Sequence, residues 1–471
     1  MLKKILIANR GEIAVRIVRA CAEMGIRSVA IFTEPDRHAL HVKRADEAYS
    51  MGEDPLAGYL DARRIVNLAV ETGCDAIHPG YGFLSENAEF AQICQERGIT
   101  FIGPKADVIA KMGDKTQARK SMIAAGVPVT PGSEDNLANI DEAVLLAHDI
   151  GYPVMLKATS GGGGRGIRRC DSEKELRDQY PRVISEATKA FGSAEVFLEK
   201  CIVDPKHIEV QILADSQGEA IHLYERDCSI QRRNQKLIEI APSPQLTPEQ
   251  RSYVGELAVK AAKAVGYENA GTVEFLVTGN DIYFMEMNTR VQVEHTITEQ
   301  ITGVDIVREQ IRVASGLALS YRQEDISYRG FALQFRINAE DPKNSFLPSF
   351  GRITRYYAPG GPGVRTDTAI YTGYTIPPYF DSMCLKLVVW ALNWEDALDR
   401  GARALADMRV QGVKTTANYY QEILKNEEFR SGHFNTSFVP NHPELLNYSD
   451  KRAPSEIALA IAAAIAAHAA V

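Results

Sequence analysis

The chain contains the stretch Glu286-Met287-Asn288-Thr289-Arg290-Val291-Gln292-Val293-Glu294, in which polar and apolar side chains alternate. Because successive side chains of an extended strand point to opposite faces, a strand here would carry its polar side chains in one row. At about 3.3 Å per residue the row would extend about 26 Å, enough to hold a triphosphate, its metal ions and a second substrate in line. The alternative is a half-buried strand whose polar side faces water. We define the polar row as Glu286, Asn288, Arg290, Gln292 and Glu294.

A β-hairpin is predicted just before this row, because two strand-like runs, 271–277 and 282–287, flank Gly279-Asn280. A two-residue turn would pair Glu274 with Met285, whereas a three-residue loop through Asp281 would set Glu274 opposite Glu286. We predict the second register. Facing carboxylates repel each other unless a cation such as Mg²⁺ lies between them. Carboxylate and amide oxygens without His or Cys favour a hard cation over zinc.

The N-terminal part alternates strands and helices and predicts a parallel, doubly wound sheet. No GxGxxG follows the first strand, so we do not expect a dinucleotide site there. The segment His78-Pro-Gly-Tyr81-Gly-Phe-Leu-Ser85-Glu86-Asn87 would lie at the carboxyl end of a strand, where such sheets bind ligands, and Ser85 could cap the next helix. The expected strands are 5–9, 28–32, 76–77 and 100–102, and the expected helices are 12–24, 62–71 and 87–96.

A glycine-rich loop, Gly161-Gly162-Gly163-Gly164-Arg165-Gly166, lies between two predicted strands, 152–158 and 167–170. No P-loop Lys-Ser/Thr follows, and a hairpin lid whose backbone amides cover phosphates fits better than a linker. Lys157 belongs to the preceding apolar strand, where a charged amine needs an anion. Lys115 precedes another helix and could also bind phosphate, although an isolated surface lysine is the more common case.

Two further segments have functional potential. Residues 207–212 predict a strand with His207, Glu209 and Gln211 on one face. Residues 225–236 are rich in basic and amide side chains, which suits either contact with a polyanion or a solvated loop.

Composition excludes several classes of protein. The 471 residues carry a net charge of −8 without a basic cluster, which argues against binding nucleic acid or an anionic membrane. The 7 cysteines form no CxxC pair and favour reduced thiols in the cytoplasm. The apolar stretch at the N-terminus is too short for a signal peptide and is better interpreted as a first strand, so we expect a cytoplasmic protein without a membrane segment.

These motifs together resemble the biotin carboxylase family of the ATP-grasp superfamily. The resemblance extends from Ala8-Asn-Arg-Gly-Glu-Ile to Arg336-Ile-Asn-Ala-Glu-Asp-Pro and is most specific in Glu274 and the polar row. Within the family, the chain is most like the biotin carboxylase subunit of two-subunit pyruvate carboxylases, which often have Arg-Arg-Asn-Gln-Lys at the position of 232–236.

The resemblance implies an α/β fold with ATP-grasp architecture. Its expected parts are an N-terminal doubly wound, Rossmann-like domain (1–113), a small α+β lid domain (114–203), an ATP-grasp catalytic portion (204–330), a C-terminal α+β domain (331–447) and a tail helix (448–471). Ser455 could cap this tail helix, in which Ile457, Ile461 and Ile465 would form an apolar stripe. The tail is then either an ordinary terminal helix or, in our hypothesis, a docking helix for a partner protein.

The implied activity is ATP-dependent carboxylation of biotin by bicarbonate through carboxyphosphate. The residues implied for ATP are Lys115, Lys157, Gly161, Gly162, Gly163, Gly164, Glu199, Lys200, Ile202, His207, Gln231, Asn234 and Lys236, and those implied for two Mg²⁺ or Mn²⁺ ions are Glu274, Glu286 and Asn288. Bicarbonate would be held by Arg290, Gln292 and Val293, with Glu294 as base and Lys236 counted among the catalytic groups. Arg336 would stabilise the biotin anion, and Tyr81 and Glu86 would border the biotin.

The implied partners are a biotin carboxyl carrier and a carboxyltransferase, because we find no Met-Lys-Met biotinylation site and no length for a transferase domain. A homodimer is also implied. We expect pyruvate as the final acceptor, with acetyl-CoA, another acyl-CoA or 2-oxoglutarate as alternatives. Two departures from the family are Asn234, where histidine is usual in acetyl-CoA carboxylase components, and Thr296, where proline is usual. Other interpretations are a different ATP-grasp ligase and a non-catalytic ATP-binding regulator.

Overall fold

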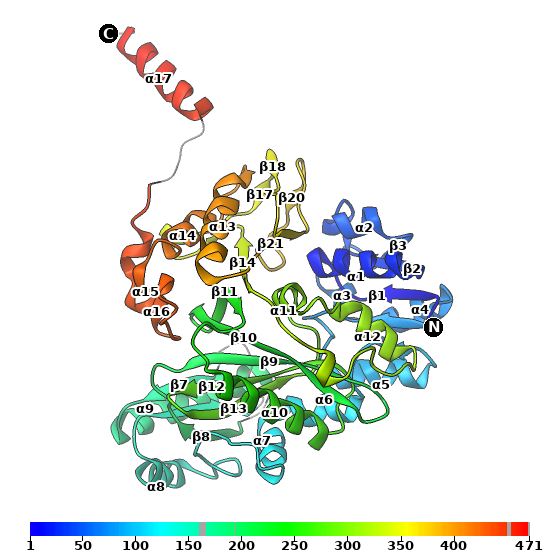
Figure 1. Cartoon of the computed structure of the whole chain (residues 1–471), viewed down its shortest axis with the longest axis vertical. Helices are drawn as coiled ribbons and strands as arrows, with labels where there is room; N and C mark the ends of the chain where they lie inside the picture. Colours follow the sequence, from blue (N-terminus) through cyan, green and yellow to red (C-terminus); the bar gives the residue numbers. More distant parts are fainter. Residues whose placement is uncertain (160–165, 193, 450–453, 470–471) are drawn as a thin grey trace.

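The computed structural model describes residues 1–159, 166–192, 194–449 and 454–469. Figure 1 shows the N-terminal part beside a large central sheet, with a small lobe below and α17 apart from the rest. The glycine-rich loop at 161–164 lies outside the described residues. Within the described residues, no helix is long and apolar enough to cross a membrane.

The N-terminal part contains the predicted parallel sheet, in the order β3-β2-β1-β4-β5. Its helices alternate with the strands as the apolar periodicity predicts. Ser85 is not a helix cap, because the side chain of Asn87 accepts the hydrogen bond from the Phe90 N–H instead. The elements are β1 (Lys4–Ile7), α1 (Gly11–Glu23), β2 (Arg27–Phe32), α2 (Leu40–Arg44), β3 (Glu47–Ser50), α3 (Ala57–Leu60), α4 (Ala62–Glu71), β4 (Ala76–His78), α5 (Ala88–Glu96), β5 (Thr100–Phe101) and α6 (Ala106–Gly113).

The small lobe is an antiparallel sheet in the order β7-β6-β8, covered by helices. Strand, glycine-rich loop and strand therefore follow each other as predicted. The elements are α7 (Lys115–Ala124), α8 (Ile140–Ile150), β6 (Val154–Ala158), β7 (Ile167–Cys170), α9 (Glu173–Phe191) and β8 (Val196–Lys200).

One sheet of eight strands, in the order β13-β12-β9-β10-β11-β14-β21-β19, forms the centre of the molecule. It joins the strands before residue 330 to those after it through the antiparallel pairing of β11 with β14. The strands are β9 (Lys206–Ala214), β10 (Ala220–Arg232), β11 (Gln235–Ala241), β12 (Asn269–Thr278), β13 (Asp281–Asn288), β14 (Phe331–Asn338), β19 (Val364–Thr368) and β21 (Met383–Ala391). Side chains from distant parts of the chain can therefore share one surface.

Helices and short strand pairs surround this sheet. The helices are α10 (Pro248–Ala264), α11 (His295–Thr302), α12 (Ile306–Ala314), α13 (Trp394–Asp407), α14 (Ala417–Ile423), α15 (Glu427–Arg430), α16 (Phe438–Asn441) and α17 (Pro454–Ala469). The strand pairs are β15 (Glu340–Asp341) with β16 (Leu347–Pro348), β17 (Gly351–Arg352) with β20 (Thr375–Ile376), and β18 (Arg355–Tyr357) with β22 (Arg409–Gln411). Since α17 begins at Pro454, Ser455 lies inside the helix and is not its cap.

The hairpin β12–β13 places Glu274 opposite Glu286, as predicted, but by another route. Thr278 pairs with Asp281, so the turn has two residues, Gly279 and Asn280. A β-bulge then shifts the register between Glu274 and Phe275, which pairs with Phe284 and leaves Met285 as the extra residue. The predicted three-residue loop is wrong, and the bulge brings the two carboxylates together.

The polar row is not one strand. β13 ends at Asn288, and the chain turns so that Glu294 becomes the N-cap position of α11. The Gln292 and Glu294 carbonyls accept hydrogen bonds from the His295 and Ile297 N–H groups, which starts the helix. The predicted extent of about 26 Å is therefore wrong, because backbone hydrogen bonds of a helix start replace those of a strand.

The segment 225–236 is not a solvated loop. Its first part continues β10, where Arg226 is completely buried, and its last two residues open β11. Arg233 and Asn234 form the exposed turn between them, both with positive φ, 50° and 64°. Asn tolerates this left-handed conformation, so the turn gives a local reason for asparagine at 234.

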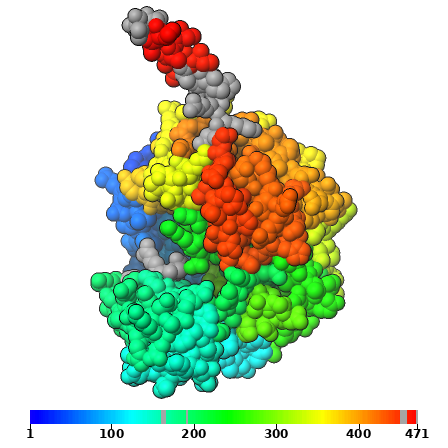
Figure 2. All heavy atoms as spheres, turned by 90° about the vertical axis from the view of Figure 1, so that its left-hand side faces the viewer, coloured from blue at the N-terminus to red at the C-terminus, as the bar shows by residue number. Residues whose placement is uncertain are grey.

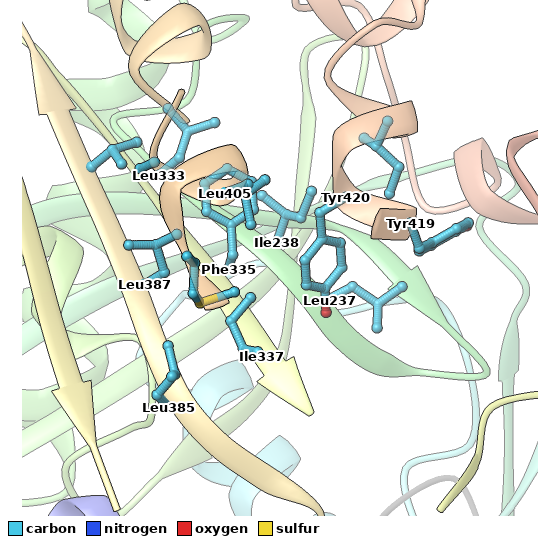
Figure 3. Packing of buried hydrophobic residues seen from close by; sticks show 14 of the residues in the cluster. Leu237, Ile238, Leu333, Phe335, Ile337, Leu385, Leu387, Leu405, Tyr419 and Tyr420 are labelled. Carbon is cyan, nitrogen blue, oxygen red and sulfur yellow. The ribbon is translucent and has the colours of Figure 1, made fainter. Parts of the chain in front are cut away.

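The largest apolar core lies between β11, β14, β21 and the helices α13 and α14, as Figure 3 shows. Phe335 and Leu387 point toward Leu405 and Tyr420 in this cluster. Phe335 is completely buried. Because β14 carries both this core and Arg336, the core fixes the position of that arginine.

We expect Phe335→Ala to lower the free energy of unfolding by about 3–5 kcal/mol, since it leaves a large cavity in a packed core. Tyr357→Ala is the control, because Tyr357 is 63% exposed and such surface changes cost about 0.5 kcal/mol or less. Urea unfolding followed by circular dichroism measures both. Equal midpoints for the two variants would contradict this assignment of the core.

Candidate active site

A partly buried lysine on β11, Lys236, binds three carboxylates from different elements. Its Nζ donates to Glu209 on β9 at 2.5 Å, to Glu274 on β12 at 2.9 Å and to Glu294 at the start of α11 at 2.7 Å. We call Lys236, Glu209, Glu274 and Glu294 the lysine cluster. Burial lowers the pKa of Lys236, but the three carboxylates outweigh it and hold the pKa well above its usual value. The ammonium therefore stays charged.

Glu294 lies between two cations. One carboxylate oxygen accepts from Lys236, and the other accepts from Arg336 Nη2 at 3.0 Å. Burial raises the pKa of Glu294, but Lys236, Arg336 and Arg226 hold it far below its usual range. Glu294 is therefore ionised and is a weak base as long as both cations remain on it.

Arg336 has one guanidinium nitrogen, Nη1, that is spare within the described residues. Its Nε donates to Glu239 on β11 at 2.5 Å and its Nη2 donates to Glu294. Burial lowers the pKa of Arg336, but Glu239 and Glu294 raise it above its usual value. Its Nη1 makes no hydrogen bond to any residue that the structure describes, so it is available to an oxyanion.

The expected metal ligands lie together at the end of the β12–β13 hairpin. Asn288 Nδ2 donates to Glu274 at 2.9 Å, and Glu286 faces Glu274 across the two strands. Across the described ranges, the Glu286 carboxylate has neither a hydrogen bond nor an ion pair, although the backbone of Glu286 belongs to the β12–β13 ladder. Burial raises the pKa of Glu286, the Glu274 carboxylate raises it further, and Lys115 and Lys236 oppose the shift. A partly buried carboxylate that lacks a partner beside a second carboxylate fits a hard cation.

A second acidic group near this hairpin needs no metal. Ligand atoms of His207, Glu209 and Glu274 lie within 4.8 Å of one another, but Lys236 already binds both carboxylates. His207 Nε2 lies 2.9 Å from Glu274. Burial lowers the pKa of His207, and Glu274 outweighs this and raises it. Lys236 and His207 therefore offset part of the negative charge of these two carboxylates.

Hydrogen bonds from several elements hold the rest of the polar row. Gln292 Oε1 accepts from Arg226 Nη2 at 2.6 Å, and Gln292 Nε2 donates to Glu274 at 2.8 Å. Arg290 Nε donates to Glu86 at 2.8 Å and Arg290 Nη2 to Asn288 Oδ1 at 2.9 Å. The Val293 carbonyl accepts from Lys386 Nζ at 2.9 Å. The turn after β13 thus brings together the residues that the sequence placed on one strand.

Two residues of the N-terminal part reach the same region. Glu86 binds Arg290, and its other oxygen accepts from the Thr289 N–H. The Tyr81 hydroxyl donates to Glu12, whose other oxygen forms an ion pair with Lys386 at 3.0 Å. Tyr81 and Glu86 are therefore joined to the polar row through these contacts.

The residues expected around a nucleotide divide between the small lobe and the central sheet. Lys157 on β6 meets an anion, as predicted, and that anion is Glu199 on β8. Lys200 donates to the Gly151 and Tyr152 carbonyls at 2.9 and 3.0 Å, and Ile202 follows it, partly buried. Burial lowers the pKa of Lys115. Gln231 pairs with Lys236 in the β10–β11 ladder, whereas Asn234 lies in the exposed turn beyond it.

The sequence did not identify four residues that hold this site together, namely Glu12, Arg226, Glu239 and Lys386. All four are buried in strands or helices of the core. Arg226 donates to five side chains, Glu209, Gln211, Thr272, Gln292 and Thr298, and so has no donor left for a polyanion. A charged residue within an apolar run, the signal that singled out Lys157, could also have found Lys386, which lies between Leu385 and Leu387.

Comparisons with known proteins agree with this arrangement. Family models for the biotin carboxylase N-terminal domain, the ATP-binding domain of the carbamoyl-phosphate synthase L chain and the biotin carboxylase C-terminal domain match residues 1–109, 114–322 and 334–441. The 2-oxoglutarate carboxylase small subunit of Hydrogenobacter thermophilus is 56% identical over 470 residues, 99% of each chain. A pyruvate carboxylase subunit of Methanothermobacter thermautotrophicus is 53% identical over 443 residues, 94% of this chain and 90% of that one.

A solved structure is similar over the same length. It is the biotin carboxylase domain dimer of the Hydrogenobacter thermophilus 2-oxoglutarate carboxylase, in complex with MgADP, ADP and bicarbonate. Its TM-score with this chain is 0.93 at 56% identity, covering 96% of this chain and 100% of that one.

We expect Lys236→Met to destabilise the fold most near neutral pH, by about 3 kcal/mol, because it leaves three buried carboxylates without their cation. In the wild type, the lowered pKa of Glu294 stabilises the fold above the unfolded carboxyl pKa of about 4.3, and this is lost as the pH falls. In the variant, burial raises the carboxyl pKa values instead, so protonation near pH 5 should narrow the difference from wild type. Urea midpoints near pH 7.5 and pH 5 measure this, and an equal difference at both would contradict it.

Proposed function

We propose, because this chain belongs to the biotin carboxylase family, that it carboxylates biotin on a separate carrier with bicarbonate and ATP. The observation that carries the proposal is the position of Arg290, Glu294 and Arg336 beside the Glu274–Glu286 pair on one surface of the central sheet. This arrangement supports roles for Arg290 as an anion-binding group, for Glu294 as a base and for Arg336 as an oxyanion donor, beside carboxylates that could hold a metal ion. The related 2-oxoglutarate carboxylase domain, in complex with MgADP and bicarbonate, supports the same ligands here.

In the first step, an oxygen of bicarbonate attacks the γ-phosphorus of ATP, and ADP leaves. This step needs positioning and charge neutralisation more than covalent help. We assign Lys115, Lys157 and Lys236 to the phosphates, and Glu199, Lys200 and Ile202 to the adenine. Lys157 would exchange Glu199 for phosphate when the nucleotide binds. We assign Glu274, Glu286 and Asn288 to Mg²⁺ or Mn²⁺, which neutralises phosphate charge when bound.

The role of Asn288 depends on which of its atoms is free. Its Oδ1, the atom that could bind a cation, accepts from Arg290 Nη2 at 2.9 Å. We propose that Arg290 leaves Asn288 to clamp bicarbonate, with Gln292 and the Val293 backbone alongside. One movement of Arg290 would then free both a metal ligand and an anion site.

Glu294 is the proposed general base, and its lowered pKa makes it a poor one in the ligand-free site. Lys236 can resolve this, because phosphates would compete with Glu294 for the same ammonium. As Lys236 turns to the nucleotide, the pKa of Glu294 should rise toward the range of a useful base. Glu294 would then accept the proton of bicarbonate only after the nucleotide has bound.

In the second step, carboxyphosphate breaks down to CO₂ and phosphate, the released phosphate would take the proton of the ureido N–H of biotin, and the resulting nitrogen anion attacks the carbon of CO₂. The biotin anion carries charge on its ureido oxygen, and the spare Nη1 of Arg336 is the donor we assign to it. Tyr81 and Glu86 would border the biotin ring.

The final acceptor depends on a carboxyltransferase that this chain would need as a partner. The similarity to a pyruvate carboxylase subunit favours pyruvate, and the similarity to a 2-oxoglutarate carboxylase subunit favours 2-oxoglutarate. We propose a 2-oxo acid and would test pyruvate first. A homodimer is proposed from the related domain dimer. All seven cysteines are free and buried, which supports our placement in the reducing cytoplasm.

Helix α17 is the proposed docking element for that partner. It projects from the C-terminal domain in Figures 1 and 2. Leu459, Ile461 and Ile465 are 71%, 54% and 63% exposed, whereas the side chain of Ile457 lies outside the described residues. A helix this apolar is normally buried. The helix follows the last family match, at 441, yet the match to the 2-oxoglutarate carboxylase small subunit covers 99% of the chain. A protein that is itself one part of a larger carboxylase therefore shares this region.

The direct test of the proposed activity is ATP cleavage that depends on bicarbonate and is stimulated by free biotin. Glu294→Gln should retain ATP binding but lose about a hundredfold or more in this turnover, as expected for the loss of a general base. Isothermal titration with a non-hydrolysable ATP analogue checks the binding. Turnover near wild type would remove Glu294 from the role of base, and a wild type without bicarbonate dependence would overturn the proposed function itself.

Removing the residues after Lys451 should abolish co-purification with the partner carboxyltransferase while leaving biotin-stimulated ATP cleavage within about twofold of wild type, since exposed residues contribute little to the fold. Ile461→Asp with Ile465→Asp in the full-length chain is the matched variant, because it keeps the length and removes the apolar surface. Assembly that is unchanged in both variants would contradict a docking role.

A further inference from the structure

Thr296 is completely buried at the second residue of α11. The first N–H groups of a helix have no intrahelical partner, so the backbone at this position makes no special demand on the residue. The backbone therefore gives no reason for threonine, and the side chain must supply one. The Thr296 hydroxyl donates a hydrogen bond to Gln334 Oε1 on β14, which is also completely buried.

This contact opens a relay of hydrogen bonds that ends at the proposed base. Gln334 Nε2 donates to Glu239 Oε2 at 2.9 Å, and the other oxygen of Glu239 accepts from Arg336 Nε at 2.5 Å. Arg336 Nη2 then donates to Glu294 at 3.0 Å. Burial raises the pKa of Glu239, whereas the Arg336 guanidinium opposes this shift and favours the carboxylate, which can only accept hydrogen bonds. The amide nitrogen of Gln334 must therefore face Glu239, and its oxygen must face Thr296.

We propose that Thr296 is a positioning residue for Arg336, acting through Gln334 and Glu239; this rests on the proposed function. With Gln334 on one oxygen of Glu239, Arg336 reaches only the other oxygen, through Nε. Its Nη2 stays on Glu294, and its Nη1 stays available. Without the hydroxyl, Gln334 loses its orientation, and both oxygens of Glu239 are open to Arg336. A bidentate pair, the preferred geometry of arginine with a carboxylate, would then draw Arg336 away from Glu294.

A purely structural role for the hydrogen bond from Thr296 to Gln334 predicts a different outcome. Loss of the Thr296 hydroxyl would then reduce stability and affect all steps of turnover together. Positioning of Arg336 predicts a lower biotin-stimulated kcat with ATP binding unchanged, because Arg336 is assigned to the biotin anion and also holds the proposed base, Glu294. The nucleotide contacts come from other residues, so the KM for ATP separates the two explanations.

The experiment compares Thr296→Val with Thr296→Ser and wild type in steady-state assays of ATP cleavage, with and without free biotin. Thr296→Val should lower the biotin-stimulated kcat about fivefold, the worth of one buried hydrogen bond, with the KM for ATP unchanged. Thr296→Ser keeps the hydroxyl and should restore wild-type kcat. Thr302→Val is the matched control, since Thr302 is on the same helix but donates to the Thr298 carbonyl. It should leave kcat unchanged.

Gln334→Met provides a second test if Thr296→Val folds poorly. Gln334→Met breaks the relay one step later, so it should lower the same kcat, and adding Thr296→Val to it should have little further effect. If Thr296→Val and Gln334→Met together lower the biotin-stimulated kcat by the product of their separate factors, the relay is wrong. It is also wrong if Thr296→Ser lowers this kcat as much as Thr296→Val does. If wild type shows no biotin stimulation, the proposed function fails rather than the relay.

Discussion

The ammonium of Lys236 is the contact on which the rest of the site depends. Glu209, Glu274 and Glu294 come from two strands and a helix start, and three buried carboxylates at hydrogen-bond distance from one point would repel each other strongly. Lys236 lies within 2.9 Å of all three, and Arg226 and Arg336 supply the remaining positive charge. The contacts of Lys236 therefore tie the positions of β9, β12 and the start of α11 to one another.

The same balance divides the surface into two ends with different chemistry. Glu274 is bound by Lys236, His207, Asn288 and Gln292, and Lys236 and His207 outweigh burial to hold its pKa well below the usual value. Glu286, across the hairpin, lacks such partners in the described chain, and burial raises its pKa. Glu294 is held by cations that ligands could draw away. Glu286, whose charge lacks a partner, has the property that a metal ligand requires. Glu294, whose cations can be drawn away, has the property that a base requires.

The sequence predicted which strands form better than it predicted their detailed geometry. Alternation and turn residues identified the β12–β13 hairpin and the strands on either side of the glycine-rich loop, whereas most of the proposed site residues came from the family resemblance. The bulge at Met285 has no local signal, because it depends on how β12 pairs with its neighbours. The alternation of polar and apolar residues continues to Glu294, although β13 ends at Asn288. The pattern does not reveal this end, because the turn and the start of α11 also bring polar side chains to the same surface. Arg226 and Glu239 were missed because their partners are distant in sequence.

The central claim is that this surface transfers carbon from bicarbonate to biotin at the expense of ATP. The most direct measurement follows isotopically labelled bicarbonate into free biotin while ADP is counted in the same reaction. The account predicts labelled carboxybiotin only when ATP, a divalent cation and biotin are all present, and no label in biotin when ATP is replaced by a non-hydrolysable analogue. ATP cleavage without label in biotin, at saturating biotin, would contradict it.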